Sequence, residues 1–174
     1  MKRRCGCAVL LAVPIAVMAG AKAHEHGVAR LDIGAEPGLI AIHLESPLDN
    51  LAGFERAPKN AAERQRLDTV LARLKAADTL FRFDTAAQCS VTKVVLSSAA
   101  LQLGDFDPKD AADGHADIDA DYAFACKGAA PGFVDTTLLE AMPRLQRVEV
   151  QAAGSKGQSR ATLKRPDRRV TIRN

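Results

Sequence analysis

The chain has 174 residues and a formal net charge of +3, from 24 basic and 21 acidic side chains. This length suits one domain with a buried core. Aromatic residues make up only 4% of the chain, with no Trp and one Tyr, which argues against stacking sites for sugars or nucleic-acid bases.

The first 23 residues are predicted to be a secretory signal peptide and not part of the fold. Basic residues at positions 2–4 precede an apolar run over 8–19, which is too short to span a bilayer. A small-x-small pattern ends at Ala23, so we expect cleavage between Ala23 and His24. The mature chain, residues 24–174, is then expected to be a single periplasmic domain with no membrane span.

Cleavage also changes the charge balance. It removes four basic residues and no acidic ones, which leaves 20 basic and 21 acidic residues and a formal charge of −1. The basic excess therefore belongs to the targeting segment, and we expect no nucleic-acid binding.

Two of the four cysteines, Cys89 and Cys126, remain in the mature chain. An even pair in an exported protein predicts a disulfide, because the compartment is oxidising. Such a bridge would stabilise the fold by about 3–4 kcal/mol. The alternative, a two-thiolate metal site, lacks a close-spaced partner cysteine, so we favour the disulfide.

Residues 28–44 alternate apolar and polar side chains on both sides of a turn at 35–38, which is the pattern of a β-hairpin. A four-residue turn would pair the apolar positions on one face: Ile33 with Ile40, Leu31 with Ile42, and Ala29 with Leu44. This register places His43 on the outer face opposite Arg30, a cation that disfavours a second positive ion nearby. We therefore interpret His43 as an ordinary surface residue.

Two helices are expected next. Residues 46–58 combine a capping serine, a proline suited to the first helical position and a terminating proline, which predicts a short helix. Asn60 and Glu63 then have the spacing of a capping box. The apolar spacing beyond them predicts an amphipathic helix of about five turns that ends near Phe81.

The remainder is mostly β-strand. The elements expected are strands at 89–103, 114–126, 145–153, 158–164 and 169–172, a loop at 104–113 and a short helix at 135–142. The order predicts an α+β fold in a single domain with one disulfide. Its antiparallel sheet, or sheets, would contain about seven strands, accompanied by one long and two short helices.

The strand at 114–126 has two contrasting faces. One face is apolar and suits a sheet that packs on the core. The other is an acidic row headed by an imidazole: His115, Asp117, Asp119 and Asp121. Such a row is usually a solvated outer face. The alternative is that His115 and Asp117 share an ion, with the other two carboxylates contributing charge.

Cleavage would make His24-Glu25-His26 the amino terminus, with an α-amine and two imidazoles. Neutral imidazole suits zinc, copper and nickel, so binding should weaken below about pH 6. A frayed, soluble terminus is the alternative interpretation. Since a zinc site needs three or four ligands, our hypothesis is that His24 and His26 act together with His115 and Asp117.

The sequence carries no recognisable catalytic signature. It has no His-x-x-x-His helix motif, no nucleophile elbow and no glycine-rich phosphate loop. With both mature cysteines assigned to a disulfide, no cysteine is left for catalysis. We therefore do not expect an enzyme.

Several segments together resemble one bacterial family. HEHGVARLDI directly after a signal peptide, then SPLDNLAGFERAP, a cysteine after the long helix, and HAD leading into YAFAC are similar to the zinc-regulated periplasmic protein family called ZrgA. SPLDNLAGFE is the most specific part, and the resemblance covers nearly all of the mature chain. Compared with the family pattern, the loop at 104–113 is short and free of histidine, and Arg56 stands where a histidine is common.

The resemblance implies a periplasmic zinc-binding accessory protein that acts alongside a zinc importer or its periplasmic binding protein. Zinc is then the expected cofactor, with other divalent transition metals as alternatives. The alternative function is a metal-independent periplasmic interaction module, in which the GFERAP segment and the sheet surface contact a partner protein.

Overall fold

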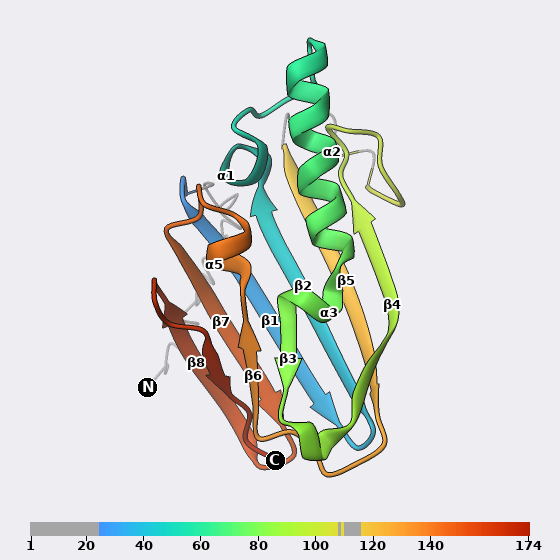
Figure 1. Cartoon of the computed structure of the whole chain (residues 1–174), viewed down its shortest axis with the longest axis vertical. Helices are drawn as coiled ribbons and strands as arrows, with labels where there is room; N and C mark the ends of the chain where they lie inside the picture. The colour runs from blue at the N-terminus through green and yellow to red at the C-terminus, as the bar shows by residue number, and fades with distance from the viewer. Residues whose placement is uncertain (1–24, 108, 110–115) are drawn as a thin grey trace, which may run out of the picture.

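The computed structural model describes residues 25–107, 109 and 116–174 (Figure 1). The elements in chain order are β1 (Val28–Glu36), β2 (Leu39–Pro47), α1 (Leu48–Ala52), α2 (Ala61–Lys75), α3 (Ala77–Leu80), β3 (Phe81–Phe83), a 3₁₀ turn (Thr85–Ala87), β4 (Cys89–Ser97), β5 (Asp117–Cys126), β6 (Phe133–Thr136), α5 (Leu138–Ala141), β7 (Arg147–Gly154), β8 (Gly157–Leu163) and β9 (Arg169–Thr171). The described part of the chain is therefore a mixed α+β structure, as predicted.

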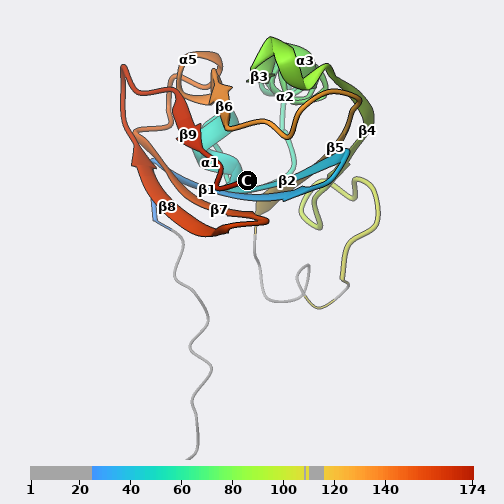
Figure 2. The same ribbon diagram turned by 90° about the horizontal axis from the view of Figure 1, so that it is seen from below.

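The strands form two sheets. The larger sheet has the order β4-β5-β2-β1-β7-β8, and the smaller one has the order β3-β6-β9. Seen from below, the larger sheet curves around α1, α2, α3, α5 and the smaller sheet, which all lie on one of its faces (Figure 2). We call this the inner face, and we call the opposite face of the larger sheet the outer face.

The predicted count of about seven strands is wrong, because the described residues already contain nine. The two that were missed, β3 and β6, are three and four residues long, and strands this short show too little alternation to be recognised. The antiparallel prediction also fails at one pairing, since β1 and β7 are parallel. These two strands are far apart in the sequence, so no local pattern indicates that they meet.

The long predicted helix is shorter than expected. α2 ends at Lys75, and α3 adds one further turn before Phe81 begins β3. Ala76 separates the two helices, because its φ of −84° and ψ of 61° lie outside helical geometry. The Asn60 half of the predicted capping box is confirmed, since the Glu63 N–H donates to Asn60 Oδ1 over 2.9 Å. The Glu63 carboxylate accepts from the Lys59 N–H over 2.7 Å.

The β1–β2 hairpin is confirmed, but its register differs from the predicted one by two residues. The turn contains only Pro37 and Gly38. A shift of two keeps every side chain on its predicted face, because side chains alternate along a strand. It does change the cross-strand partners, so that His43 lies opposite Asp32 and not opposite Arg30.

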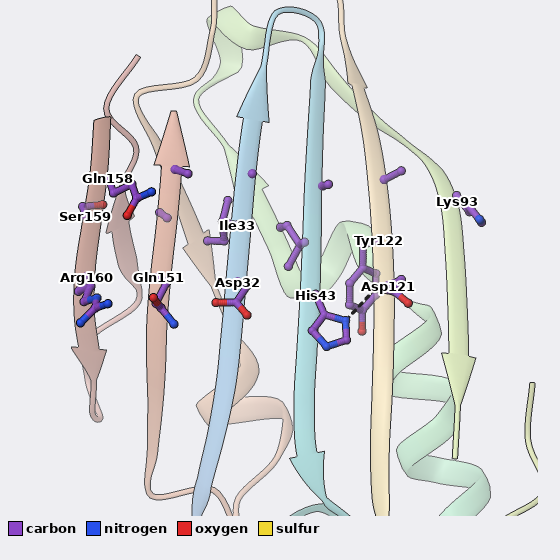
Figure 3. Close-up of a pocket in the computed structure, with 16 residues that line it drawn as sticks. Asp32, Ile33, His43, Lys93, Asp121, Tyr122, Gln151, Gln158, Ser159 and Arg160 are labelled. Carbon is purple, nitrogen blue, oxygen red and sulfur yellow. Dashed lines mark hydrogen bonds and ion pairs between the residues drawn. The ribbon is translucent and has the colours of Figure 1, made fainter. Parts of the chain in front are cut away.

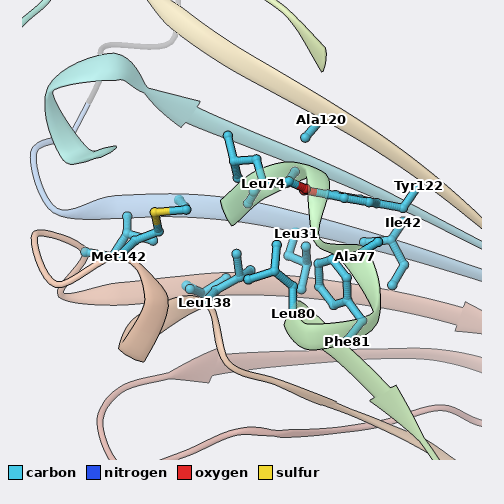
Figure 4. Close-up of a cluster of buried hydrophobic side chains, with 14 of the residues drawn as sticks. Leu31, Ile42, Leu74, Ala77, Leu80, Phe81, Ala120, Tyr122, Leu138 and Met142 are labelled. Atoms are coloured by element: carbon cyan, nitrogen blue, oxygen red, sulfur yellow. The ribbon is translucent and has the colours of Figure 1, made fainter. Parts of the chain in front are cut away.

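The core lies between the inner face of the larger sheet and the helices (Figure 4). Leu31 and Ile42 from the sheet and Leu74 from α2 are all buried. Tyr122 packs edge-on against Phe81, with ring centroids 5.0 Å apart. The Tyr122 hydroxyl donates a hydrogen bond to the Leu74 carbonyl over 3.0 Å, which ties β5 to the carboxyl end of α2.

The predicted disulfide is confirmed. Cys89 and Cys126 are joined by an S–S bond of 2.04 Å and face each other in the register of β4 and β5. The apolar face of β5 is buried, as its alternation predicted. The strand that begins at Cys89 ends at Ser97 and does not extend to position 103.

Candidate functional site

The structure describes two of the four predicted metal ligands, His26 and Asp117. The other two, His24 and His115, lie outside the described residues. His26 precedes the first residue of β1, and Asp117 is the first residue of β5. Both strands begin at the same end of the larger sheet, where β2 ends and α1 starts (Figure 1).

A single buried side chain fixes the amino-terminal segment to α1. Asn50 accepts a hydrogen bond from the Gly27 N–H over 2.5 Å and donates one to the Val28 carbonyl over 2.8 Å. The Asn50 amide also donates to the Glu25 carbonyl over 3.5 Å. Buried backbone groups need such partners, so Asn50 determines where the chain enters β1.

His26 lies beside Asp49, a carboxylate that the sequence did not single out. The distance from His26 Nδ1 to Asp49 Oδ2 is 3.1 Å, and the His26 side chain is 73% exposed. Arg144 donates to the other Asp49 oxygen over 3.2 Å and so holds the carboxylate in place. No local pattern links positions 26 and 49, and only the fold reveals this contact.

Asp117 lies on the other side of the junction between β2 and α1. It faces Pro47 in the register of β2 and β5, and the Leu48 N–H donates to the Ala116 carbonyl over 2.7 Å. The segment that carries His26 and the segment that carries Asp117 therefore contact the same short junction.

The described residues do not form a complete metal site by themselves. Within residues 25–107, 109 and 116–174, no group of three or more His, Cys, Asp or Glu side chains is arranged to hold a metal ion. A zinc site normally has three or four protein ligands. Any such site at this end of the sheet would therefore include residues beyond the described ones.

A second group of ionisable side chains lies in the middle of the outer face (Figure 3). His43 lies between Asp32 on β1 and Asp121 on β5 in the strand register. The His43 Nδ1 is 2.8 Å from Asp121 Oδ1, and its Nε2 is 3.8 Å from Asp119 Oδ1. The predicted cationic neighbour of His43 is thus wrong, because the two-residue difference in register surrounds this imidazole with carboxylates.

Burial and the neighbouring charges shift the pKa values of His43 and Asp119. Burial lowers the pKa of His43, but the hydrogen bond and charge of Asp121, with the charges of Asp119 and Asp32, outweigh burial and raise this pKa above 6.5. Burial also raises the pKa of Asp119 to about 6, and nearby carboxylates add to the effect while His43 opposes it. The charge of this part of the outer face therefore changes close to neutral pH.

The same group borders a depression of about 560 Å³ in the outer face (Figure 3). Small residues form its floor, where Ala41 pairs with Gly34 on one side and with Ala123 on the other. Lys93 on β4 and Arg160 on β8 add positive charge at the two edges of the sheet. A flat floor with a charged border suits contact with a polar ligand or a segment of another protein.

The GFERAP segment is engaged within the molecule. Phe54 is 8% exposed and belongs to the core. The Arg56 guanidinium lies 5.6 Å from the centre of the Phe54 ring and forms an ion pair with Glu63 over 2.7 Å. The Arg56 hydrogen bonds, with one from the Lys59 N–H, lower the pKa of Glu63 to about 2. Arg56 thus links the segment after α1 to the start of α2.

Taken together, the fold and the two groups define an α+β protein with a disulfide, and with His and carboxylate side chains both at one end of its larger sheet and in the middle of its outer face. A family model described as "ZrgA family zinc uptake protein" matches residues 23–172. The chain belongs to this family, which confirms the resemblance seen in the sequence. No curated protein matches the chain.

Among the helices that the structure describes, none is long and apolar enough to cross a membrane.

Proposed function

We propose that this protein binds zinc in the periplasm and assists zinc acquisition by passing the ion to an importer or to its binding protein. Membership in a zinc uptake family supports this role. The proposal includes export and the removal of residues 1–23. It also holds that the protein carries an ion and does not catalyse a reaction.

The observation that carries the proposal is the common position of His26 and Asp117 beside the junction of β2 and α1. Each is one member of a ligand pair, with His24 two residues before His26 and His115 two residues before Asp117. The pairs together would supply three imidazoles and one carboxylate, a ligand number and chemistry that zinc accepts.

Asp49 has a supporting role in this proposal. Its carboxylate accepts the hydrogen bond of the His26 Nδ1–H, which leaves Nε2 as the nitrogen for zinc. Carboxylate partners of this kind fix the orientation of a ligating imidazole and increase its basicity. Arg144 holds Asp49 from the other side, so the imidazole is oriented before the ion arrives.

Calorimetric titration of zinc into the processed protein at neutral pH tests the proposal. We expect saturable binding at micromolar or tighter affinity, and weaker binding in both the His24→Ala/His26→Ala variant and the His115→Ala variant. His43→Ala is the matched control, since it removes an imidazole from the outer face and should leave the isotherm unchanged. Absence of saturable binding, or its loss in His43→Ala alone, would contradict the proposal.

A metal-independent interaction module is the second candidate, and the depression in the outer face favours it. In this case a partner would copurify from the periplasm with or without a chelator. Ala41→Arg, which places a long side chain on the floor of the depression, would abolish copurification. Copurification that needs zinc and withstands Ala41→Arg would support the first function instead.

A further inference from the structure

We propose that residues 24–26 of the processed chain form a planar chelate for Cu(II) or Ni(II), distinct in its ligand atoms from the zinc site. The four nitrogen ligands would be the α-amine of His24, the backbone nitrogens of Glu25 and His26, and the His26 Nδ1. This inference rests on one part of the proposed function, the cleavage after Ala23.

The chemistry depends on the position of the histidine. When an imidazole is on the third residue of a free amino terminus, its Nδ1 and the three preceding nitrogens close fused chelate rings around one ion. Square-planar nitrogen ligation is typical of Cu(II) and Ni(II), whereas zinc prefers a tetrahedral arrangement. Binding releases the two amide protons and the proton of the ammonium to solvent, so it strengthens as the pH rises.

The chain is firmly anchored directly after residues 24–26. Gly27 is held on both sides, since its N–H donates to Asn50 and its carbonyl accepts from the Gln146 N–H over 2.7 Å. The His26 side chain, one residue earlier, is 73% exposed. The chain is thus anchored immediately after the three residues that the chelate requires.

The peptide between Glu25 and His26 has a favourable orientation for this chelate. The Glu25 carbonyl accepts hydrogen bonds from the Val28 N–H over 3.2 Å and from the Asn50 amide over 3.5 Å, so it points toward the protein. In a trans peptide the carbonyl oxygen and the amide hydrogen point in opposite directions. The His26 nitrogen therefore faces away from these partners, where an ion can reach it.

The two metals would use different nitrogens of His26. In the zinc proposal the His26 Nδ1 keeps its hydrogen bond to Asp49 and Nε2 coordinates the ion. In the copper or nickel chelate Nδ1 coordinates the ion, so the hydrogen bond to Asp49 is lost. Asp49→Asn should therefore weaken zinc binding by roughly tenfold, as expected for a lost orienting carboxylate. The same variant should leave the copper chelate intact.

Titration of Cu(II) into the processed protein, followed by visible absorption and electron paramagnetic resonance, tests this inference. Mass spectrometry first establishes that the chain begins at His24. We expect one equivalent of Cu(II) to give the spectrum of a planar four-nitrogen site, and Ni(II) to give a diamagnetic planar complex. His24→Ala should keep both spectra, because its imidazole is not a ligand, and His26→Ala should lose them.

The decisive control is a chain with one additional alanine before His24. It retains every side chain but moves His26 to the fourth position, so the planar spectrum should be lost. A spectrum that survives this insertion, or a processed chain that begins at another residue, would overturn the inference. Failure of zinc to bind while the planar copper spectrum appears would reject the zinc function and leave the chelate supported.

Discussion

His43 lies on the outer face of the larger sheet with carboxylates on both neighbouring strands. Burial opposes the protonated imidazole, but the hydrogen bond and charge of Asp121 and the charges of Asp119 and Asp32 together outweigh burial and favour the protonated form. Because the pKa of His43 is raised in the folded protein, its contribution to stability is fully present below about pH 6.5. That contribution is lost as the pH rises through the folded-state pKa.

Substitution of Asp121 tests this interpretation of His43. In the unaltered protein, the His43 ring protons should titrate by NMR with a midpoint above 6.5, and Asp121→Asn should lower that midpoint because the strongest charged partner is gone. Asp78→Asn, an exposed carboxylate on α3, should leave it unchanged. A midpoint that does not move in Asp121→Asn would show that the ion pair does not form in solution.

Asn50 is the residue whose loss should most affect the amino-terminal segment. Asn50→Ala leaves the buried backbone groups of Gly27 and Val28 without their partners, so we expect a loss of about 2–3 kcal/mol in the free energy of unfolding. Hydrogen exchange at the Gly27 amide should also become faster. Denaturant unfolding and NMR exchange measure the two effects.

Asn60→Ala is the control for this substitution. It removes the cap of α2, should cost about 1 kcal/mol, and should leave exchange at Gly27 unaltered. If Asn50→Ala destabilises no more than Asn60→Ala and does not change that exchange, Asn50 does not anchor the terminus.

At the scale of the elements, the two-residue turn between β1 and β2 fixes the register of the hairpin. Gly38 has a φ of +79°, a conformation that costs an L-residue about 1 kcal/mol or more. A Cβ at this position would meet only ordinary contacts, the nearest being the Cys126 carbonyl oxygen at 3.6 Å. The expected cost of a substitution is therefore conformational and not steric.

Gly38→Ala should lower the free energy of unfolding by about 1 kcal/mol, measured by urea denaturation. Gly34→Ala in the same hairpin is the matched control, because it has no positive φ and no atom within 4 Å of the added Cβ. It should change stability by no more than about 0.5 kcal/mol. Equal effects of the two variants would show that the turn does not impose the left-handed conformation.

The sequence predicted the faces of the strands better than their partners. A shift of two residues in the pairing of two strands leaves every side chain on the same face of the sheet. The buried residues around Leu31 and Ile42 could therefore be identified from the sequence, but the register of the strands could not. The environment of His43 was missed for this reason. β3 and β6 are too short for a pattern, and the parallel pairing of β1 with β7 has no local signal.

The candidate site was predictable only in part, for a related reason. Histidines beside a predicted cleavage position and a row of carboxylates on one strand can be recognised locally. Asp49 and Asn50 could not be, because their contacts with residues 25–28 join segments that meet only through the tertiary fold.

At the scale of the whole molecule, one end of the larger sheet brings together the start of β1, the end of β2 and the start of β5 (Figure 1). Asn50 anchors the first of these segments, and Leu48 contacts the last through the Ala116 carbonyl. The chain belongs to a zinc uptake family, and this arrangement supports our proposal that an ion is held between the amino terminus and β5, where a partner would receive it.

The most direct test of this account is an NMR titration of zinc into the isotopically labelled, processed protein. Saturable shifts should appear at His26 and Asp117 and at the intervening junction residues Leu48 and Asp49, while the signals of His43 stay in place. Shifts confined to the surroundings of His43, or the absence of saturable shifts anywhere, would contradict a zinc site at this end of the sheet.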